Sequence, residues 1–255
     1  MKKRPLILIT NDDSIYAKGI ASLIEAVKDL GDILVVAPEK PQSGMGHAIT
    51  VNHPLRLQKS DRYEGIEAYS CSGTPVDCVK LAIYEILHER PDIIVSGINH
   101  GANYATNVLY SGTMSAAVEG ALEGIPSIGF SLLDHDLDAD FDASKYYAER
   151  ITQEVLKNGL TKGVCLNVNI PKLPITEIAG IKVCRQAKAY WEDKFDKRQD
   201  PFGQDYYWLT GKFENFDGGE DTDVYAIQQK YVSVVPTQFD MTAHHAISEI
   251  NQWDI

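Results

Sequence analysis

The segment LILITNDDS, residues 6–14, sets the fold class of this chain and carries its most unusual polar residues. It opens with a short continuous apolar run that stops at polar residues, which is typical of a strand buried in a parallel sheet. Asn11, Asp12 and Asp13 follow directly. Two adjacent carboxylates raise at least one pKa unless a cation or strong donors compensate. The segment therefore indicates either a solvated turn, the usual interpretation of an isolated Asp pair, or a place where a cation binds.

The chain beyond this segment alternates between strand and helix patterns as far as residue 170. Short apolar runs predict strands over 5–10, 33–38, 91–97, 127–132 and 164–170. Apolar residues at helical spacing, with caps such as Thr74 before Pro75, predict helices over 20–30, 75–87, 113–122 and 143–158. This alternation predicts an α/β fold, a three-layer Rossmann-like arrangement around a mostly parallel, doubly wound sheet.

The pattern changes after about residue 185, where the chain becomes aromatic, acidic and rich in turn residues. We expect a Rossmann-like catalytic core over 1–185 and a C-terminal extension over 186–255, with a β-hairpin, an oligomerisation segment and a return to the core through a strand at 231–238. The aromatic residues predict a subunit interface. An equally good interpretation is a hairpin folded onto its own sheet. The acidic stretch 134–142 is expected to be a solvated loop and helix start.

Composition narrows the class of protein. The chain has 255 residues, 44% of them hydrophobic and 24% charged, and a formal net charge of -12. This charge argues against stable nucleic-acid binding, because phosphate contacts need clustered Lys and Arg. No apolar run reaches the length of a membrane span or a signal-peptide core. The four cysteines show no CxxC spacing, so we expect a cytoplasmic protein with reduced thiols and no membrane partner.

Polar, glycine-rich segments follow three of the predicted strands: NDDS (11–14), EKPQSGMGH (39–47) and SGINHGAN (96–103). Ligands of open parallel sheets bind beyond the carboxyl ends of the strands, so the three segments are expected to meet at one edge. Asp12 and Asp13 would supply anionic oxygens there, and Ser43 and Asn99 neutral ones. An all-oxygen set of this kind suits Mg²⁺, Mn²⁺ or Ca²⁺ better than Zn²⁺. A cation at this edge would make the carboxylate pair tolerable.

The segment YSGTMSAAVEGALEG, residues 110–124, is a polar turn that opens a helix of small residues. Free amides at Gly112 and Thr113, with the Ser111 and Thr113 hydroxyls, would form an anion site at the helix N-terminus. The alternative is that Ser111 or Thr113 simply caps the helix, and one residue can do both. His47 and His100 lie in the polar segments, and either could act as a general acid.

Taken together, these segments resemble the SurE (survival protein E) family of divalent-metal-dependent 5′/3′-nucleotidases with a Rossmann-like fold. The resemblance runs through ITNDD, APEKPQSGMGHAIT, SGTPVDCVKLAI, the stretch from PDIIVSGINHGAN to SIGFSL, NVNIP and DTDVYAIQQKYVSVVPTQFDMTAH. It implies one divalent cation per subunit, Mg²⁺ or Mn²⁺, on Asp12, Asp13, Ser43 and Asn99. It also implies a phosphate site formed by Gly44, Asn103, Ser111, Gly112 and Thr113, with catalytic roles for Asp12, Asp13, Asn103 and Ser111.

The resemblance further implies hydrolysis of nucleoside monophosphates to nucleoside and phosphate, with short polyphosphate as a further substrate, and a homodimer or homotetramer built through the C-terminal extension. The nucleophile is either water, bound to the metal or oriented by Asp13, or an aspartate that forms a phosphoenzyme. A competing class is a module that binds a nucleotide without turning it over. The family usually has Gly where this chain has Ser14, which changes the backbone angles that the turn allows.

Overall fold

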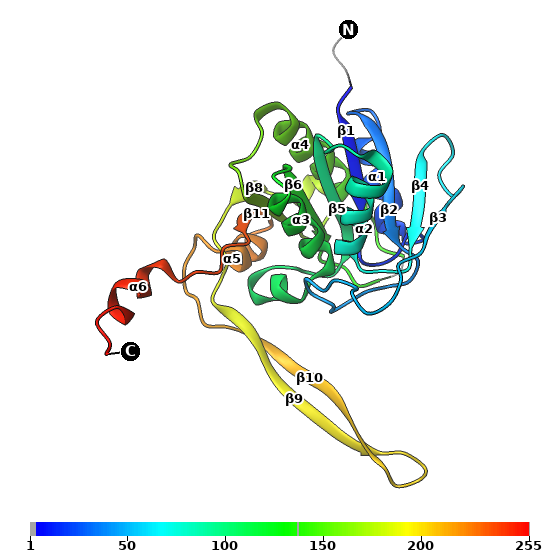
Figure 1. Ribbon diagram of the computed structural model, residues 1–255. Coiled ribbons are helices and arrows are strands. Elements are labelled where there is room, and N and C mark those ends of the chain that lie inside the picture. The colour runs from blue at the N-terminus through cyan, green and yellow to red at the C-terminus, as the bar shows by residue number, and fades with distance from the viewer. Residues whose placement is uncertain (1–3, 137, 255) are drawn as a thin grey trace.

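The computed structural model describes residues 4–136 and 138–254. Its main sheet has nine strands in the order β3-β4-β2-β1-β5-β6-β7-β11-β8 (Figure 1). The strands are β1 Leu6–Thr10, β2 Asp32–Pro38, β3 Leu57–Lys59, β4 Glu67–Cys71, β5 Ile93–His100, β6 Ser127–Leu132, β7 Val164–Ile170, β8 Gly180–Val183 and β11 Tyr231–Gln238. The helices are α1 Lys18–Val27, α2 Pro75–Leu81, α3 Gly112–Leu122, α4 Asp142–Asn158, α5 Asp223–Gln228 and α6 His244–Ile250.

Strand β1 lies at the centre of the parallel part of the sheet. It pairs in parallel with β2 on one side and with β5 on the other. Because the chain passes from β1 to β2 in one direction and reaches β5 in the other, the strand order reverses beside β1. The crevice at the carboxyl ends of these strands is the usual ligand site of an open α/β sheet.

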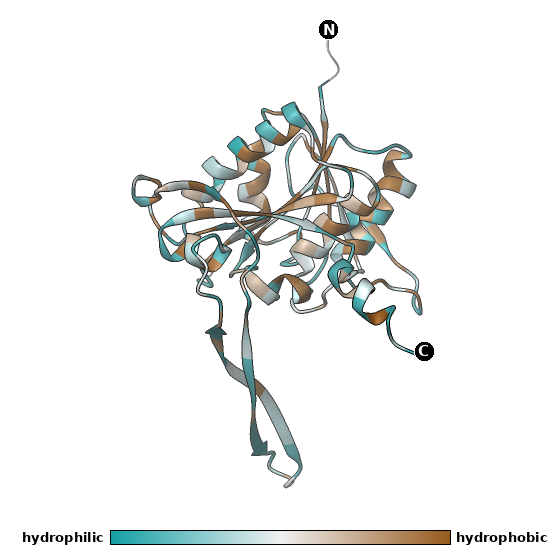
Figure 2. Cartoon of the chain, turned by 90° about the vertical axis from the view of Figure 1, so that its left-hand side faces the viewer, coloured by the Kyte–Doolittle hydropathy of each residue, from teal (hydrophilic) through white to brown (hydrophobic). Residues whose placement is uncertain are grey.

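Helices cover both faces of the sheet, which gives three layers. On one face α1 and α4 pack over strand residues such as Ile9 and Phe130. On the other face α2 and α3 contribute residues such as Val79 and Ala116 to a second core that includes Leu8. Alternate residues of β1 therefore enter different cores, as the pleat of a strand requires. The predicted α/β class with a mostly parallel sheet is confirmed, and Figure 2 shows the helices on both sides of the strands.

Several edge elements have no counterpart among the predicted strands and helices: β3, β4, β8, α5 and α6. The three strands have three to five residues, most of them partly or fully exposed, so no run of apolar residues marks them. The predicted helix over 75–87 is α2 followed by a π-helical turn, Ala82–Leu87. The predicted helix over 113–122 begins one residue earlier, at Gly112, because Ser111 is its N-cap.

The acidic stretch 134–142 is less solvated than we expected. Asp134 is only 7% exposed, and its carboxylate binds the Lys172 ammonium at 2.9 Å. Ala139 and Phe141 are buried in the core beneath α1 and α4. Ala139 and Phe141 therefore attach the described part of this stretch to the body, while residue 137 lies outside the described residues.

The hairpin of strands β9 (Ala189–Gln199) and β10 (Asp205–Asn215) forms a separate two-stranded sheet that projects from the body as a long arm (Figure 1). The chain then returns to the main sheet, where β11 pairs antiparallel with β7 and parallel with β8. Helix α6 follows and lies apart from the sheet (Figure 1). The division into a core over 1–185 and an extension over 186–255 stays a prediction. Within the described residues, no helix combines the length and apolar character needed to cross a membrane.

Candidate metal and phosphate site

Two carboxylates follow β1 directly. Asp12 is 4% exposed, and its Oδ1 accepts a hydrogen bond from the Thr113 hydroxyl at 2.5 Å. Burial, and after it the charge of Asp13, raises the pKa of Asp12 to about 6. Asp13 accepts a hydrogen bond from the backbone N–H of His100 at 3.3 Å, and burial raises the pKa of this carboxyl too. Among the described residues, no Lys or Arg forms an ion pair with either aspartate.

The first turn of α3 lies against Asp12. A Cβ at Gly112 would be 2.6 Å from the Asp12 Cβ, so this close approach requires glycine. Ser111 is the N-cap, and its hydroxyl accepts a hydrogen bond from the Met114 N–H at 3.0 Å. The cap predicted for Ser111 is therefore present. Thr113 is fully buried and directs its hydroxyl at the Asp12 carboxylate.

A cavity of about 280 Å³ opens beyond these strands. Its lining includes seven of the residues that the sequence singles out: Asp12, Ser43, Gly44, Asn99, His100, Asn103 and Ser111. Asp13, Gly112 and Thr113 do not line it. Gly112 and Thr113 instead contact the Asp12 side chain. Asp13 lies against the backbone of His100. The three polar segments therefore do meet at one edge of the sheet.

Asn99 enters the cavity from an irregular part of β5. The pairing of β5 with β6 shifts register between Ser96 and Asn99, and bulges of this kind re-aim side chains beside functional sites. The Asn99 amide nitrogen donates to the Gly101 carbonyl at 2.9 Å. The amide oxygen of Asn99 is therefore the atom left to act as an acceptor in the cavity.

Asn103 is held by polar residues from two neighbouring strands. Its backbone N–H donates to Asn169 Oδ1, its carbonyl accepts from Asn167 Nδ2, and its own Nδ2 donates to Ser131 Oγ, each at 2.8 Å. Sequence reasoning missed Asn167 and Asn169. The signal was a pair of asparagines at alternate positions of a buried strand, VCLNVNI (164–170), where polar residues need a specific partner.

The segment 39–47 is tied to the site by its backbone. Gln42 N–H donates to the Asp12 carbonyl at 2.7 Å, and Gly44, with φ +75, faces open space. His47 Nε2 lies 2.9 Å from a carboxylate oxygen of Glu119, a residue buried in α3. His47 thus anchors the segment and does not line the cavity. Of the two histidines considered as general acids, only His100 is part of the lining.

The outer wall of the cavity was not predicted. It consists of Asn107 and Tyr110, from a 3₁₀ helix (Ala105–Tyr110), and Trp191, from β9. The Trp191 indole N–H donates to Asn107 Oδ1 at 3.0 Å. Because Trp191 is far in sequence from the other lining residues, which all lie before residue 112, no local pattern links it to the site.

Comparison with known proteins gives the family. The family described as "Survival protein SurE" matches residues 7–193. A protein of Flavobacterium johnsoniae named 5′-nucleotidase SurE is 62% identical over 254 residues, which cover 99% of this chain and 98% of that protein. A Christiangramia forsetii protein of the same name is 61% identical, with 100% and 98% covered. The chain belongs to the SurE family.

A solved SurE structure has the same fold. The crystal structure of the SurE protein from Aquifex aeolicus superimposes with a TM-score of 0.84 at 38% identity, covering 97% of this chain and 98% of that one. The resemblance expected from the sequence motifs is therefore confirmed.

The donor atoms at this edge of the sheet fit a hard cation. Asp12 and Asp13 are adjacent carboxylates with pKa values raised by burial, and the lining adds Ser43 and Asn99, neutral oxygen donors, beside Asp12. Among the described residues, no group of three or more His, Cys, Asp or Glu gathers as a metal site. Two carboxylates with neutral oxygens suit Mg²⁺ or Mn²⁺ and not a soft metal.

Proposed function

We propose that this chain is a metal-dependent 5′/3′-nucleotidase that hydrolyses nucleoside monophosphates to nucleoside and phosphate. The observation that carries the proposal is the Asp12–Asp13 pair, which has no Lys or Arg partner among the described residues. Asp12 is buried and lines the cavity together with Gly44 and Ser111, and the half-buried Asp13 follows it directly. The names of the relatives, 5′-nucleotidase SurE, agree with this activity.

Asp12, Asp13, Ser43 and Asn99 are proposed to hold one divalent cation, Mg²⁺ or Mn²⁺. When bound, such a cation neutralises charge on phosphoryl oxygens and lowers the pKa of water. The chain's own part is to fix the ligands. Thr113 orients Asp12 through its hydroxyl, the His100 N–H orients Asp13, and Gly101 orients the Asn99 amide.

The phosphate is proposed to bind Gly44, Asn103, Ser111, Gly112 and Thr113. The N-terminus of α3 lies beside Asp12, and the positive end of the helix dipole favours an anion there. Its Thr113 and Met114 N–H groups already bind Asp12 and the Ser111 hydroxyl. Asn103 and Ser111 line the cavity with side chains that other residues already hold in place. Fixed donors of this kind stabilise charge that develops in the transition state. The nucleoside would extend toward Tyr110 and Trp191.

Water is the proposed nucleophile, with Asp13 accepting its proton. The alternative is attack by an aspartate to give a phosphoenzyme. A single turnover in ¹⁸O-labelled water tests for the phosphoenzyme, because direct attack by water labels only phosphate, whereas a phosphoenzyme opened at its aspartyl carbonyl leaves label in the aspartate. Label found in Asp12 or Asp13 by peptide mass spectrometry would rule out direct attack.

The activity is tested by phosphate release from a panel of nucleoside 5′- and 3′-monophosphates and tripolyphosphate, each with EDTA, Mg²⁺ or Mn²⁺. We expect release that EDTA abolishes and a metal restores. A folded sample that binds a nucleotide yet releases no phosphate under any condition would instead support a nucleotide-binding module.

A homodimer or homotetramer through the C-terminal extension is part of the same proposal. The arm exposes Phe195, Tyr207, Trp208 and Leu209, each by more than half of its surface. Exposed apolar residues at this density are typical of an interface. Light scattering coupled to gel filtration measures the mass directly, and a monomer at micromolar concentration would contradict this part. A cytoplasmic location is likewise proposed, supported by four buried cysteines that remain free thiols.

A further inference from the structure

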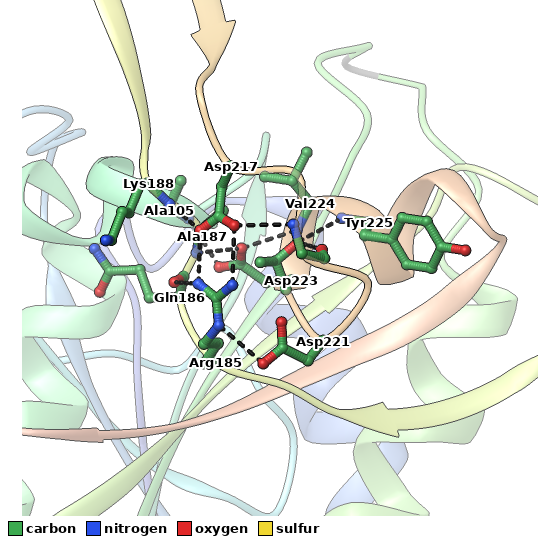
Figure 3. A network of polar contacts seen from close by, with 12 residues as sticks. Ala105, Arg185, Gln186, Ala187, Lys188, Asp217, Asp221, Asp223, Val224 and Tyr225 are labelled. Atoms are coloured by element: carbon green, nitrogen blue, oxygen red, sulfur yellow. Dashed lines mark hydrogen bonds and ion pairs between the residues drawn. The ribbon is translucent and has the colours of Figure 1, made fainter.

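Asp223, the first residue of α5, is a buried carboxylate outside the site described above. It is 0% exposed. Its Oδ2 accepts a hydrogen bond from the Ala105 N–H at 2.9 Å, and its Oδ1 accepts from the N–H groups of Ala187 at 2.9 Å and Val224 at 2.8 Å (Figure 3). Burial raises the pKa of this carboxyl, while these N–H groups lower it. All three donors are backbone groups, two of them far from Asp223 in sequence.

One of the donors, Ala105, has an unusual backbone. Its φ is +50, in the left-handed region that residues with a Cβ rarely adopt, and the residue is fully buried. Such a conformation persists only where the surroundings impose it. The Asp223 carboxylate is the group that binds the Ala105 N–H.

Ala105 belongs to the segment that carries two of the residues lining the cavity. Ala105 begins the 3₁₀ helix that runs to Tyr110, so it lies between Asn103 and Ser111, which line the cavity. The path of the backbone at Ala105 therefore determines how these two side chains are spaced. Ala187, the second remote donor, lies just before β9, which carries Trp191 to the outer wall of the cavity.

We propose that Asp223 is a positioning residue of the phosphate site, which holds Ala105 left-handed and so fixes the segment from Asn103 to Ser111. We call Asp223 with its bonds to Ala105 and Ala187 the Asp223 clamp. The proposal rests on the proposed function, because it takes Asn103 and Ser111 as phosphate contacts. The clamp makes no hydrogen bond to the loop after β1, which carries the cation ligands Asp12 and Asp13.

The test compares Asp223→Asn with Asp221→Asn in the full chain. Asp221 is a matched control because it belongs to the same network (Figure 3), is 68% exposed, and binds the Arg185 guanidinium without contacting Ala105. Asn at 223 loses one of the two acceptor oxygens. We expect Asp223→Asn to weaken the affinity for inorganic phosphate, measured by calorimetry with Mn²⁺ present, by at least about tenfold. The affinity for Mn²⁺ should stay within about twofold, and Asp221→Asn should change neither.

A rescue experiment tests the role of the backbone at Ala105. Glycine adopts positive φ without strain, so Ala105→Gly should restore phosphate affinity to Asp223→Asn by at least about threefold. Asp223→Asn with wild-type phosphate affinity would overturn the proposal. So would equal losses of phosphate and Mn²⁺ affinity, or a double variant no better than Asp223→Asn alone.

A second variant covers the case in which Asp223→Asn does not fold. Ala105→Val leaves Asp223 intact but disfavours positive φ, since β-branched residues avoid that region. Ala189→Val is its control, because Ala189 is equally buried in the same small cluster. We expect Ala105→Val alone to lose phosphate affinity, and equal losses in the two variants would overturn the clamp. If the wild type binds phosphate but releases none from nucleotides, the proposed function fails, while these affinities still decide on the clamp.

Discussion

The site at the carboxyl edge of the sheet and the β9–β10 arm differ in how much surrounds each side chain. At the sheet edge Asp12, Asn103, Ser111 and Thr113 are all at most 6% exposed, and each side chain has a hydrogen-bond partner. In the arm, by contrast, Ala189 is the single buried residue of β9, and none of the residues Asp205–Asn215 is buried.

This difference determines where substitutions should matter. A residue of the sheet edge touches several elements, so a change there displaces partners from different strands. A residue of the arm faces mainly solvent and its neighbour across the hairpin, so it can change without affecting the body. The base of the arm contacts the segment that lines the cavity: Trp191 binds Asn107, the Ala189 carbonyl accepts from Thr106, and Phe213 packs against Tyr104.

The largest effect on activity is expected from the two aspartates at the sheet edge. Asp12→Asn combined with Asp13→Asn should lower kcat/KM for nucleoside monophosphates by at least about 10³-fold, because both anionic ligands of the proposed cation are lost. Circular dichroism should remain that of the folded wild type. Turnover that persists in this variant would place the cation elsewhere.

The same charges should destabilise the protein when metal is withheld. The pKa of Asp12 is about 6 in the folded chain against 3.8 in an unfolded one, so the stability that protonated Asp12 contributes is fully present below pH 4 and is lost as the pH rises through 6. The shift corresponds to about 3 kcal/mol. In EDTA, Tm should therefore fall between pH 5 and 7 more for the wild type than for Asp12→Asn. Equal slopes for both proteins would contradict the shift.

The close contact between α3 and Asp12 predicts the next effect. Gly112→Ala places a Cβ 2.6 Å from the Asp12 Cβ, so α3 or Asp12 must move. We expect a loss of about 1–3 kcal/mol in unfolding free energy, by urea denaturation, and a lower kcat. Gly218→Ala is the control, since its Cβ would meet no atom within 4 Å. Equal effects of both changes would show that Asp12 has room to adjust.

Replacing Ser14 by glycine is expected to raise the stability of the protein. The φ of Ser14 is +93, while its carbonyl accepts a hydrogen bond from Asn11 Nδ2 at 2.8 Å. Ser14→Gly should raise the unfolding free energy by about 1 kcal/mol, because glycine enters this conformation without strain. The hydrogen bond to the carbonyl is kept. A loss of stability would mean that the Ser14 side chain, which is buried, contributes more than the strain costs.

The smallest effect on turnover is expected from the arm. A variant that replaces residues 195–209 by Asn-Gly joins Lys194 to Thr210, which already face each other in the hairpin. Its kcat/KM per subunit should stay within about threefold of the wild type, since none of the removed residues lines the cavity. Its mass by light scattering should fall to that of a smaller assembly. An unchanged mass would remove the arm from the interface.

The sequence predicts most of the sheet because burial in a parallel sheet leaves a readable pattern. The strands over 5–10, 33–38, 127–132 and 164–170 were predicted within about a residue of their ends, since each is a continuous apolar run. Strands β3 and β8 could not be predicted this way. They have three and four residues, and their side chains are largely exposed.

The residues of the site also fall into a group that the sequence predicts and a group that it does not. Asp12, Ser43 and Asn99 come together because parallel strands place their carboxyl ends at one edge of the sheet. This could be predicted, since each residue follows a strand that the sequence reveals. Trp191 and Asp223 reach the same region from beyond residue 185, through a hairpin and a short helix whose packing no local pattern encodes. Their roles follow only from tertiary contacts. The assignments to metal and phosphate stay predictions.

The late position of β11 in the sequence delays completion of the main sheet during synthesis. This strand lies between β7 and β8 and comes from residues 231–238, so a ribosome delivers it after every strand of the parallel part. Until then β7 has an unpaired edge, the kind of edge that invites contact with other chains. Asp223 emerges just before β11. A nascent chain stopped at residue 220 therefore carries all four proposed cation ligands, an open sheet and a free Ala105 amide.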